Sequence, residues 1–397
     1  MSAPDAMRAG SCPSGGPAVL RIAHLTPAFA PDYGGIESAV AGLAKAQLEA
    51  GHLPRIVHCA PGLVPCRTER EGIELWRVPL RGHLFAGLAP GLGRALAAVD
   101  VLHVHDPRVL ALTVNAALFA RRVPALLSTH GGPWHSSRHR AAKRLHGRWG
   151  MPRLLAHYAA VLATSEADAQ AFGKIVAPGR LHLVPNGVGF SDGGRPFAPG
   201  PGDPWRWLAW GRLTRHKRFE RAIALAIEAR RLGYPVRLTI AGADAEGQAA
   251  ALARAARLAP PGCVRVAGRL APGQLAAELA AAGIVLAPSS YEGFGLTVAE
   301  AMAAGRPVIA SDIEAHRALV PEAAGLRLAY DGGVEDGLRL AGFLAALPRE
   351  LPALSEAARR AATPHGWPTR APGFLAAYRN VLGTAAPQPV AGTVQDA

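Results

Sequence analysis

The chain of 397 residues is poor in cysteine and has no long apolar run. Its four cysteines (Cys12, Cys59, Cys66 and Cys263) form no Cys-x2-Cys pair. Their spacing therefore indicates neither a zinc site nor a disulfide framework, and it favours a reducing cytoplasm. No apolar stretch approaches the ~20 residues that a helix needs to span a bilayer. Because prolines and glycines between positions 13 and 17 interrupt the apolar core that a signal peptide requires, we expect a disordered leader at residues 1–17.

Two common nucleotide-binding motifs are also missing. No Gly-x-Gly-x-x-Gly follows the first expected strand, and Gly-x4-Gly-Lys-Ser/Thr does not occur. Hydride transfer on a dinucleotide and P-loop phosphoryl transfer therefore lack their glycine-rich loops. Positive charge is abundant instead, with 43 basic residues against 29 acidic ones and a formal net charge of +14. This balance favours anionic partners such as nucleotide diphosphates, acidic lipid surfaces or nucleic acid, although a genome-wide preference for arginine explains it equally well.

Short apolar strands alternate with helical patterns, which predicts an α/β fold built on parallel sheets. A run of glycines and prolines over residues 191–204 is unsuited to the interior of a helix or strand, and it separates two such series. We expect one domain at 18–190, a linker at 191–204, a second domain at 205–366, a last amphipathic helix at 367–383 and a disordered tail at 384–397. The expected strands are Val19–Leu25, Arg55–His58, Ile73–Val78, Val101–His105, Ala125–Thr129, Ala160–Thr164, Leu181–Val184, Trp207–Trp210, Val236–Ala241, Val264–Ala267, Ile284–Ala287 and Leu326–Ala329.

The most informative segment is residues 291–300, Tyr-Glu-Gly-Phe-Gly-Leu-Thr-Val-Ala-Glu. It places Glu292 in the loop after an apolar strand and Glu300 inside the following helix. Gly293 and Gly295 allow the backbone to approach a ligand, and the start of the helix offers free N–H groups to an anion. Carboxylates on both sides can accept hydrogen bonds from hydroxyls, so the segment suits a phosphate joined to sugars. Two solvated glutamates in an ordinary strand-loop-helix unit are the structural alternative.

A basic turn opens the second domain. Residues 211–218 read Gly-Arg-Leu-Thr-Arg-His-Lys-Arg between a strand and a helix. Arg212 offers planar bidentate donors for a diphosphate, and Lys217 adds a point charge. A solvated basic turn is the alternative for this run on its own.

The first domain has two weaker candidates. Gly34 and Gly35 lie between the first strand and its helix, where backbone amides can approach a phosphate or an acceptor, although turn geometry alone also explains paired glycines. Glu37 follows them as a helix-start residue that could also touch an acceptor. His130 comes after another strand, at the carboxyl edge where open α/β sheets bind their ligands, but lone histidines are commonly structural.

These segments, in this order, closely resemble the family-4 retaining glycosyltransferases, and the likeness spans roughly residues 18–383. The resemblance implies the GT-B fold, in which two Rossmann-like parallel-sheet domains face a cleft and the C-terminal helix crosses back to the first domain. It assigns Arg212 and Lys217 to the donor pyrophosphate, Glu300 to the ribose, and Glu292 and His130 to the donor sugar. The implied catalytic residues are His130, Glu292, Arg212 and Lys217. The implied donor-binding residues are Gly34, Gly35, Arg212, Lys217, Glu292, Gly293, Phe294, Gly295, Leu296, Thr297 and Glu300.

One motif departs from the family pattern. The hinge segment Asn186-Gly187-Val188 is followed by Gly189, where the family usually has an aspartate. We therefore give this segment little functional weight.

The segment 134–149 bears on the acceptor. Its basic residues share one face at helical spacing and are interleaved with apolar ones, namely Arg140, Lys143, Arg144, Leu145, Arg148 and Trp149. Such a face suits an anionic membrane surface or a lipid pyrophosphate, and a solvated helix face is the alternative. The stretch from Thr129 to Arg148 is similar to bacterial family-4 enzymes that glycosylate polyprenyl-diphosphate intermediates of exopolysaccharides, some of which are mannosyltransferases.

The resemblance leads us to expect a retaining glycosyltransferase that needs no metal or cofactor. It would move a sugar from a nucleotide-diphosphate sugar to a hydroxyl of a glycan or lipid-linked acceptor, at the inner face of the cytoplasmic membrane. No Asp-x-Asp occurs, so the metal-binding signature of the other major glycosyltransferase fold is missing. A nucleotide-sugar epimerase or hydrolase of the same fold and an inactive sugar-nucleotide sensor are the alternatives. A nucleic-acid binder would leave the glutamate pair unexplained, so we expect no nucleic-acid partner.

Overall fold

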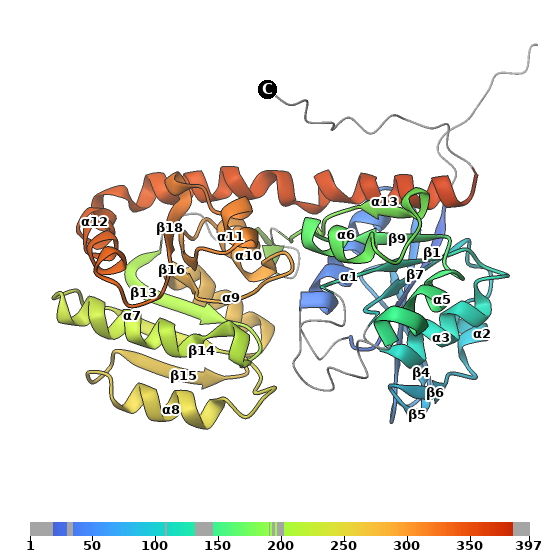
Figure 1. Cartoon of the computed structure of the whole chain (residues 1–397), viewed down its shortest axis with the longest axis horizontal. Helices are drawn as coiled ribbons and strands as arrows, with labels where there is room; N and C mark the ends of the chain where they lie inside the picture. Colours follow the sequence, from blue (N-terminus) through green and yellow to red (C-terminus); the bar gives the residue numbers. More distant parts are fainter. Residues whose placement is uncertain are drawn as a thin grey trace, which may run out of the picture.

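The computed structural model describes residues 19–29, 35–107, 109–131, 146–189, 191–192, 195–196 and 202–383. Two α/β lobes lie side by side, each built around a largely or wholly parallel sheet, and a long helical segment runs across both (Figure 1). This arrangement confirms the predicted fold class. The expected leader and tail lie outside the described residues.

The first lobe contains an eight-stranded sheet in the order β10-β9-β8-β7-β1-β2-β4-β3. Its strand pairs are parallel except for β3 and β4. The strands are β1 (Arg21–Thr26), β2 (Leu53–Ala60), β3 (Cys66–Arg70), β4 (Ile73–Pro79), β7 (Val101–His105), β8 (Ala125–Ser128), β9 (Ala160–Ala163) and β10 (Leu181–Leu183). The helices are α1 (Gly35–Glu49), α2 (Leu92–Ala95), α3 (Leu110–Phe119), α5 (Met151–Leu155) and α6 (Glu166–Phe172), and a small hairpin joins β5 (Arg81–His83) to β6 (Ala86–Leu88).

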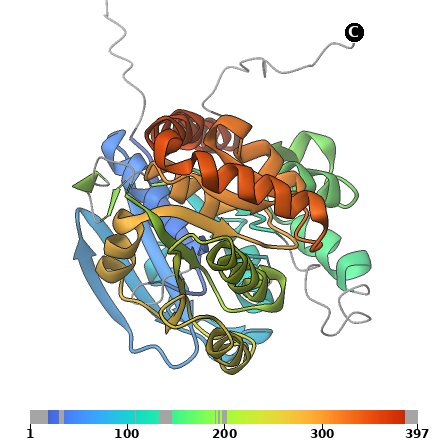
Figure 2. The ribbon, with the colours of Figure 1, turned by 90° about the vertical axis from the view of Figure 1, so that its left-hand side faces the viewer.

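The second lobe contains a six-stranded parallel sheet in the order β15-β14-β13-β16-β17-β18. Its strands are β13 (Asp203–Trp210), β14 (Arg237–Ala241), β15 (Val264–Gly268), β16 (Ala282–Ala287), β17 (Val308–Ser311) and β18 (Gly325–Leu328). Its helices are α7 (Phe219–Arg231), α8 (Ala249–Arg257), α9 (Pro272–Ala281), α10 (Leu296–Ala303), α11 (Glu314–Leu319) and α12 (Val334–Ala362). Figure 2, in which this lobe faces the viewer, shows α12 lying across the top of the sheet.

Both sheets reverse their strand order beside their first strand. In the second lobe the chain moves outward from β13 to β14 and β15, and then returns to β16 on the other side of β13. In the first lobe β1 lies between β2 and β7 in the same way. The loops after these central strands diverge and leave room for a ligand at the carboxyl edge of the sheet. The basic turn follows β13 and the glutamate loop follows β16, so the topology brings these two motifs together.

Helix α13 (Trp367–Val381) packs against the first lobe. Trp367, Phe374 and Tyr378 are buried there among residues of β1, β7 and α1. The Trp367 ring fits only because two neighbours are glycines: a methyl group on Gly42 would lie 1.9 Å from its Nε1 atom, and one on Gly187 would lie 2.4 Å from its Cδ2 atom. The indole therefore joins α1, the hinge segment and α13 in one packed contact.

The structure refines the expected boundaries. Strand β13 begins at Asp203, inside the segment expected to be linker, and Ser191–Asp192 pairs with Arg195–Pro196 as a short antiparallel bridge. These paired stretches are two residues long, which a glycine- and proline-rich segment tolerates. Helix α12 has no counterpart among the expected elements.

Candidate active site

Glu292 and Lys217 form a largely buried ion pair between the two loops at the carboxyl edge of the second sheet. Lys217 Nζ donates to Glu292 Oε1 at 2.7 Å, and Ser289 Oγ donates to the same oxygen at 2.6 Å. Burial alone would raise the pKa of the Glu292 carboxyl, but the Lys217 charge and the two hydrogen bonds outweigh burial and hold this pKa below its ordinary value. Both bonds end on Oε1, so within the described chain Oε2 has no hydrogen-bond partner and can accept one from a ligand hydroxyl.

Glu300 lies on α10, the helix that follows the glutamate loop. Burial raises the pKa of its carboxyl to about 7, and the nearby Lys217 charge offsets that rise only in part. Near neutral pH the group is thus divided between its neutral and charged forms. A ligand that donates hydrogen bonds to the carboxylate would favour the charged form.

Arg212 and Lys217 follow β13 on the same loop but differ in environment. Arg212 is exposed, whereas the Lys217 side chain is largely buried and passes close to Gly211. The loop is tied to the glutamate loop, because Ser290 N donates to the His216 carbonyl at 2.7 Å. Two cationic side chains therefore stand at the switch point of the sheet, one fixed and one free to move.

His130 follows β8 in the first lobe and has a left-handed backbone, with φ at 43°. Asp168 fixes the residues on both sides of His130, since its carboxylate accepts a hydrogen bond from Gly131 N at 2.9 Å and one from Thr129 Oγ1 at 2.5 Å. A methyl group placed on Gly293 would lie 3.5 Å from Gly131 Cα. The loop that carries His130 thus meets the glutamate loop where the two lobes come together.

The structure places the remaining predicted donor-binding residues at the junction of the lobes and around the start of α10. A methyl group on Gly35 would lie 3.1 Å from Leu296 Cδ1, so these two residues touch at the junction of the lobes. The Phe294 ring instead packs edge-on against His365, with ring centroids 5.7 Å apart. Gly295 has the positive φ of 88° that starts α10, and Thr297 is half-buried in its first turn. Gly34 lies outside the described residues.

Four further residues at this junction are absent from the sequence-based prediction. Ser289 and Asp168 anchor Glu292 and the His130 loop, as described above. Asn186 Nδ2 lies 3.2 Å from His130 Nδ1, although we had given its segment little weight. His316 is buried with Nε2 unpartnered among the described residues; burial lowers the pKa of its ring, and the Glu292 charge offsets that lowering only in part. Asn186 had a signal in the sequence through the hinge motif, and Ser289 lies three residues before Glu292 in the same loop. Asp168 is brought to its partners by the fold alone.

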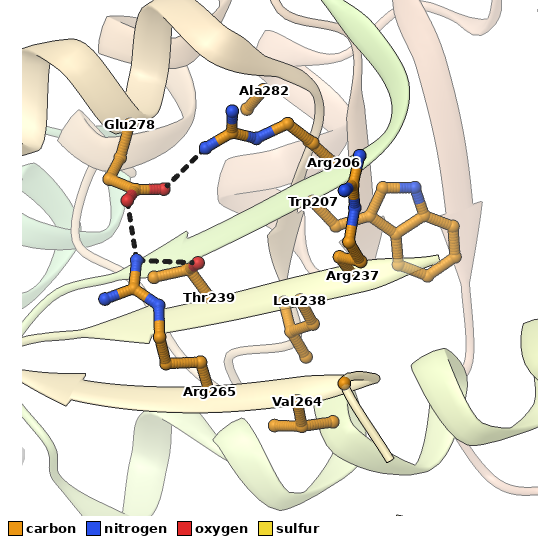
Figure 3. A pocket seen from close by; sticks show the side chains of 10 residues that line it. Arg206, Trp207, Arg237, Leu238, Thr239, Val264, Arg265, Glu278 and Ala282 are labelled. Carbon is orange, nitrogen blue, oxygen red and sulfur yellow. Dashed lines mark hydrogen bonds and ion pairs between the residues drawn. The ribbon is translucent and has the colours of Figure 1, made fainter. Parts of the chain in front are cut away.

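A separate pocket of about 390 Å³ lies in the second lobe, lined by strand residues Arg206, Arg237 and Arg265 and by Glu278 of α9 (Figure 3). Glu278 pairs with Arg265 at 2.6 Å and with Arg206 at 3.6 Å, and Asp203 pairs with Arg237 at 2.8 Å. Arg206 is near the start of β13, and Arg237 begins β14. The pocket therefore lies away from the carboxyl edge that carries the predicted site residues, and its guanidinium groups are already neutralised in part.

Comparison with known proteins decides the family. Residues 34–187 match the glycosyl transferase 4-like domain, and residues 196–329 match the glycosyl transferases group 1 domain. A GDP-mannose:cellobiosyl-diphosphopolyprenol alpha-mannosyltransferase from Xanthomonas oryzae pv. oryzae is 30% identical over 307 residues, which cover 74% of this chain and 79% of the relative. The chain therefore belongs to the family of glycosyltransferases that combine a glycosyl transferase 4-like domain with a glycosyl transferases group 1 domain. It is a glycosyltransferase with the GT-B fold.

Other similar proteins agree. A protein of the same name from Komagataeibacter xylinus is 29% identical over 387 residues, covering 94% of this chain and 96% of the relative. Among solved structures, sucrose-phosphate synthase from Thermosynechococcus elongatus is similar with a TM-score of 0.71 at 21% identity, over 92% of this chain and 99% of that one. Anabaena HepE in complex with UDP and glucose has a TM-score of 0.65 at 17% identity, over 91% and 100% of the two chains. These two structures support the fold.

We expect Lys217→Met to destabilise the protein by about 3–5 kcal/mol near pH 8 and by much less near pH 4. In the wild type the lowered pKa of Glu292 contributes stability that is lost only as the pH falls through that pKa. In the variant, burial without Lys217 raises the pKa of Glu292 above its unfolded value, so stability is lost as the pH rises through it. Urea unfolding at the two pH values measures the difference.

The matched control is Lys217→Met combined with Glu292→Gln, which buries no unpaired charge. This double variant should recover most of the stability near pH 8. An equal loss at both pH values, or no recovery in the double variant, would show that the pair does not set the stability of this loop.

Proposed function

We propose that the enzyme transfers mannose from GDP-mannose to a sugar carried on a lipid diphosphate, with retention of the anomeric configuration and without a metal ion. The relatives named above support the donor and the acceptor, because both are GDP-mannose-dependent transferases acting on a cellobiosyl diphosphopolyprenol. The observation that carries the proposal is the arrangement at the second sheet's switch point. There, Lys217 fixes Glu292 through one oxygen and leaves the other open.

The site residues have distinct roles in this proposal. Lys217 has three N–H donors, and its bond to Glu292 leaves donors for the donor diphosphate. Arg212 can close over the same diphosphate as a bidentate donor. Glu292 Oε2 accepts from a hydroxyl of the donor sugar, and Glu300 accepts from the ribose. Together the two cations would stabilise the negative charge that develops on the leaving nucleotide diphosphate, which is the role a metal ion has in other transferases.

Retention follows from attack on the same face from which the diphosphate departs. The bond between the sugar's anomeric carbon and the diphosphate oxygen breaks, and a bond from the acceptor hydroxyl oxygen to that carbon forms. The hydroxyl proton passes to the departing diphosphate, which acts as the base. This route requires no covalent nucleophile from the protein, and closure of the lobes would exclude water and limit hydrolysis of the donor.

The lipid-linked acceptor implies contact with a membrane, and part of the predicted basic segment supports it. Residues 134–145 lie outside the described part of the chain. In the described part of this region, Trp149 is 52% exposed. The guanidinium carbons of Arg148 and of the nearby Arg153 lie 5.7 and 5.6 Å from the centroid of its ring. An exposed indole with two cations close to its ring suits the interface of an anionic leaflet. Within the described residues, no helix is both long and apolar enough to span a bilayer.

The first test is binding of GDP, UDP, ADP and dTDP by calorimetry, followed by mannosyl transfer to a synthetic polyprenyl-diphosphate disaccharide. We expect GDP to bind most tightly, Arg212→Ala to weaken binding by about 10-fold or more, and the product to be the α-anomer by NMR. Transfer should continue in EDTA. Arg215→Ala, an exposed arginine of the same loop, is the charge-matched control and should bind GDP normally. Failure of folded protein to bind any diphosphate would contradict the proposed donor site.

Binding of GDP should also release a proton through Glu300. With its pKa at about 7, roughly half of the Glu300 carboxyls are protonated at pH 7, and hydrogen bonds from ribose hydroxyls favour the charged form. Binding therefore tightens as the pH rises through 7. Calorimetry in two buffers of different ionisation enthalpy should show release of about half a proton in the wild type and none through this group in Glu300→Gln. Identical proton release in both proteins would rule out Glu300 as the ribose ligand.

A further inference from the structure

A continuous line of hydrogen bonds runs from His130 into the core of the first lobe. His130 Nε2 lies 2.9 Å from His105 Nδ1, and His105 Nε2 lies 3.0 Å from His24 Nδ1. His24 Nε2 in turn lies 2.7 Å from Gln47 Oε1. His105, His24 and Gln47 come from β7, β1 and α1, and all three side chains are at most 1% exposed.

The line continues to the returning C-terminal helix. Gln47 Nε2 donates to Tyr378 Oη at 3.2 Å, and Tyr378 Oη lies 2.7 Å from His103 Nδ1. His103 Nε2 ends the line on Ser128 Oγ at 2.8 Å. The polar groups of β1, β7, β8, α1 and α13 are thus satisfied by one another inside an otherwise apolar layer.

Each bond between His130 and Gln47 in this line has one direction. Gln47 Oε1 can only accept, so His24 Nε2 carries the proton and His24 Nδ1 is an acceptor. His105 Nε2 must then donate to His24, and His130 Nε2 must donate to His105, if each ring is neutral. At the outer end, Asn186 Nδ2 donates to His130 Nδ1 at 3.2 Å, which requires the same tautomer of His130. Two amides at opposite ends of the line therefore assign the same tautomer independently.

Burial keeps the inner rings neutral. It lowers the pKa of His24 to about 4 and that of His105 well below its ordinary value, where the neighbouring His103, His130 and His24 rings lower it further. A neutral imidazole has one donor and one acceptor, so a ring cannot change its tautomer unless the whole line changes.

A metal ion is the competing interpretation of these rings. Ligand nitrogens of His24, His103 and His105 lie within 4.8 Å of one another. Each of these nitrogens, however, already has a hydrogen-bond partner at 2.7–3.0 Å, and a metal would have to displace several of those bonds. The hydrogen-bonded line accounts for all six nitrogens, so we favour it.

We propose that His105 is a positioning residue: with His24 and Gln47 behind it, it holds His130 as the neutral Nε2–H tautomer. His130 Nδ1 then faces the segment joining the two lobes as a hydrogen-bond acceptor. A hydroxyl of the donor sugar can donate a hydrogen bond to this nitrogen by replacing Asn186 Nδ2, and it cannot accept a hydrogen bond from it. The tautomer follows from the hydrogen bonds alone, whereas its importance for transfer rests on the proposed function.

The direct test is a ¹⁵N–¹H correlation spectrum of the histidine rings in protein labelled with ¹⁵N-histidine, with His130→Asn used for assignment. In the wild type near pH 7 we expect His130 to be protonated at Nε2 only. In His105→Leu only the Asn186 amide remains beside the ring, and that amide can rotate to present its oxygen, so His130 should show a mixture of both tautomers. His105→Asn is the matched variant, because an asparagine oxygen can take the place of His105 Nδ1, and it should restore the Nε2–H form.

Kinetics supply the second readout. His105→Leu should lower kcat for mannosyl transfer by about 10-fold while KM for GDP-mannose stays within about twofold, and His105→Asn should recover most of kcat. A purely structural role would instead change the melting temperature of both variants alike without a tautomer-dependent effect on kcat. If His105→Leu does not fold, Gln47→Leu tests the same line from its inner end and should also mix the tautomers.

Three results would overturn the inference: Nδ1–H His130 in the wild type, an unchanged tautomer in His105→Leu, or a shift of all three buried rings on addition of equimolar Zn²⁺. A wild type that shows the expected tautomer but transfers no sugar would instead contradict the proposed function. The two failures are therefore distinguishable.

Discussion

The ion pair between Lys217 and Glu292 is the interaction on which the candidate site depends. It joins the loop after β13 to the loop after β16, the two strands between which the order of the second sheet reverses. A buried carboxylate without this cation would be costly, so each loop holds the other in place. The pair also leaves one glutamate oxygen and part of the ammonium's hydrogen-bonding capacity open. The same contact thus stabilises the loops and provides polar groups for a donor.

In the first lobe, hydrogen bonds hold the corresponding loop in place of an ion pair. His130 has a left-handed backbone at the junction of the lobes, and Asp168 secures the loop behind it. The buried line of histidines then connects this ring to Tyr378 on α13. Since Trp367 packs the same helix against α1 and the hinge segment, the end of the chain contributes to the geometry of a residue far from it in sequence.

The sequence predicted the parts of the structure that depend on local patterns. Short apolar runs located the parallel strands, and the order of motifs placed Glu292 and Lys217 on loops that the fold brings together. Helix α12 was missed because Pro348 and Pro352 interrupt its pattern, although leucines at 340, 344, 347 and 351 are buried at helical spacing. The partnerships of Asp168 and the buried histidines depend on contacts between distant segments, which no single-sequence pattern contains.

Hydrogen exchange with and without GDP shows directly whether the donor nucleotide binds at the switch point of the second sheet. If the nucleotide binds there, backbone amides in residues 211–217 and 289–300 exchange more slowly with GDP, and exchange around Arg206, Arg237 and Arg265 is unchanged. Protection confined to the arginine-lined pocket, or to the first lobe, would contradict it.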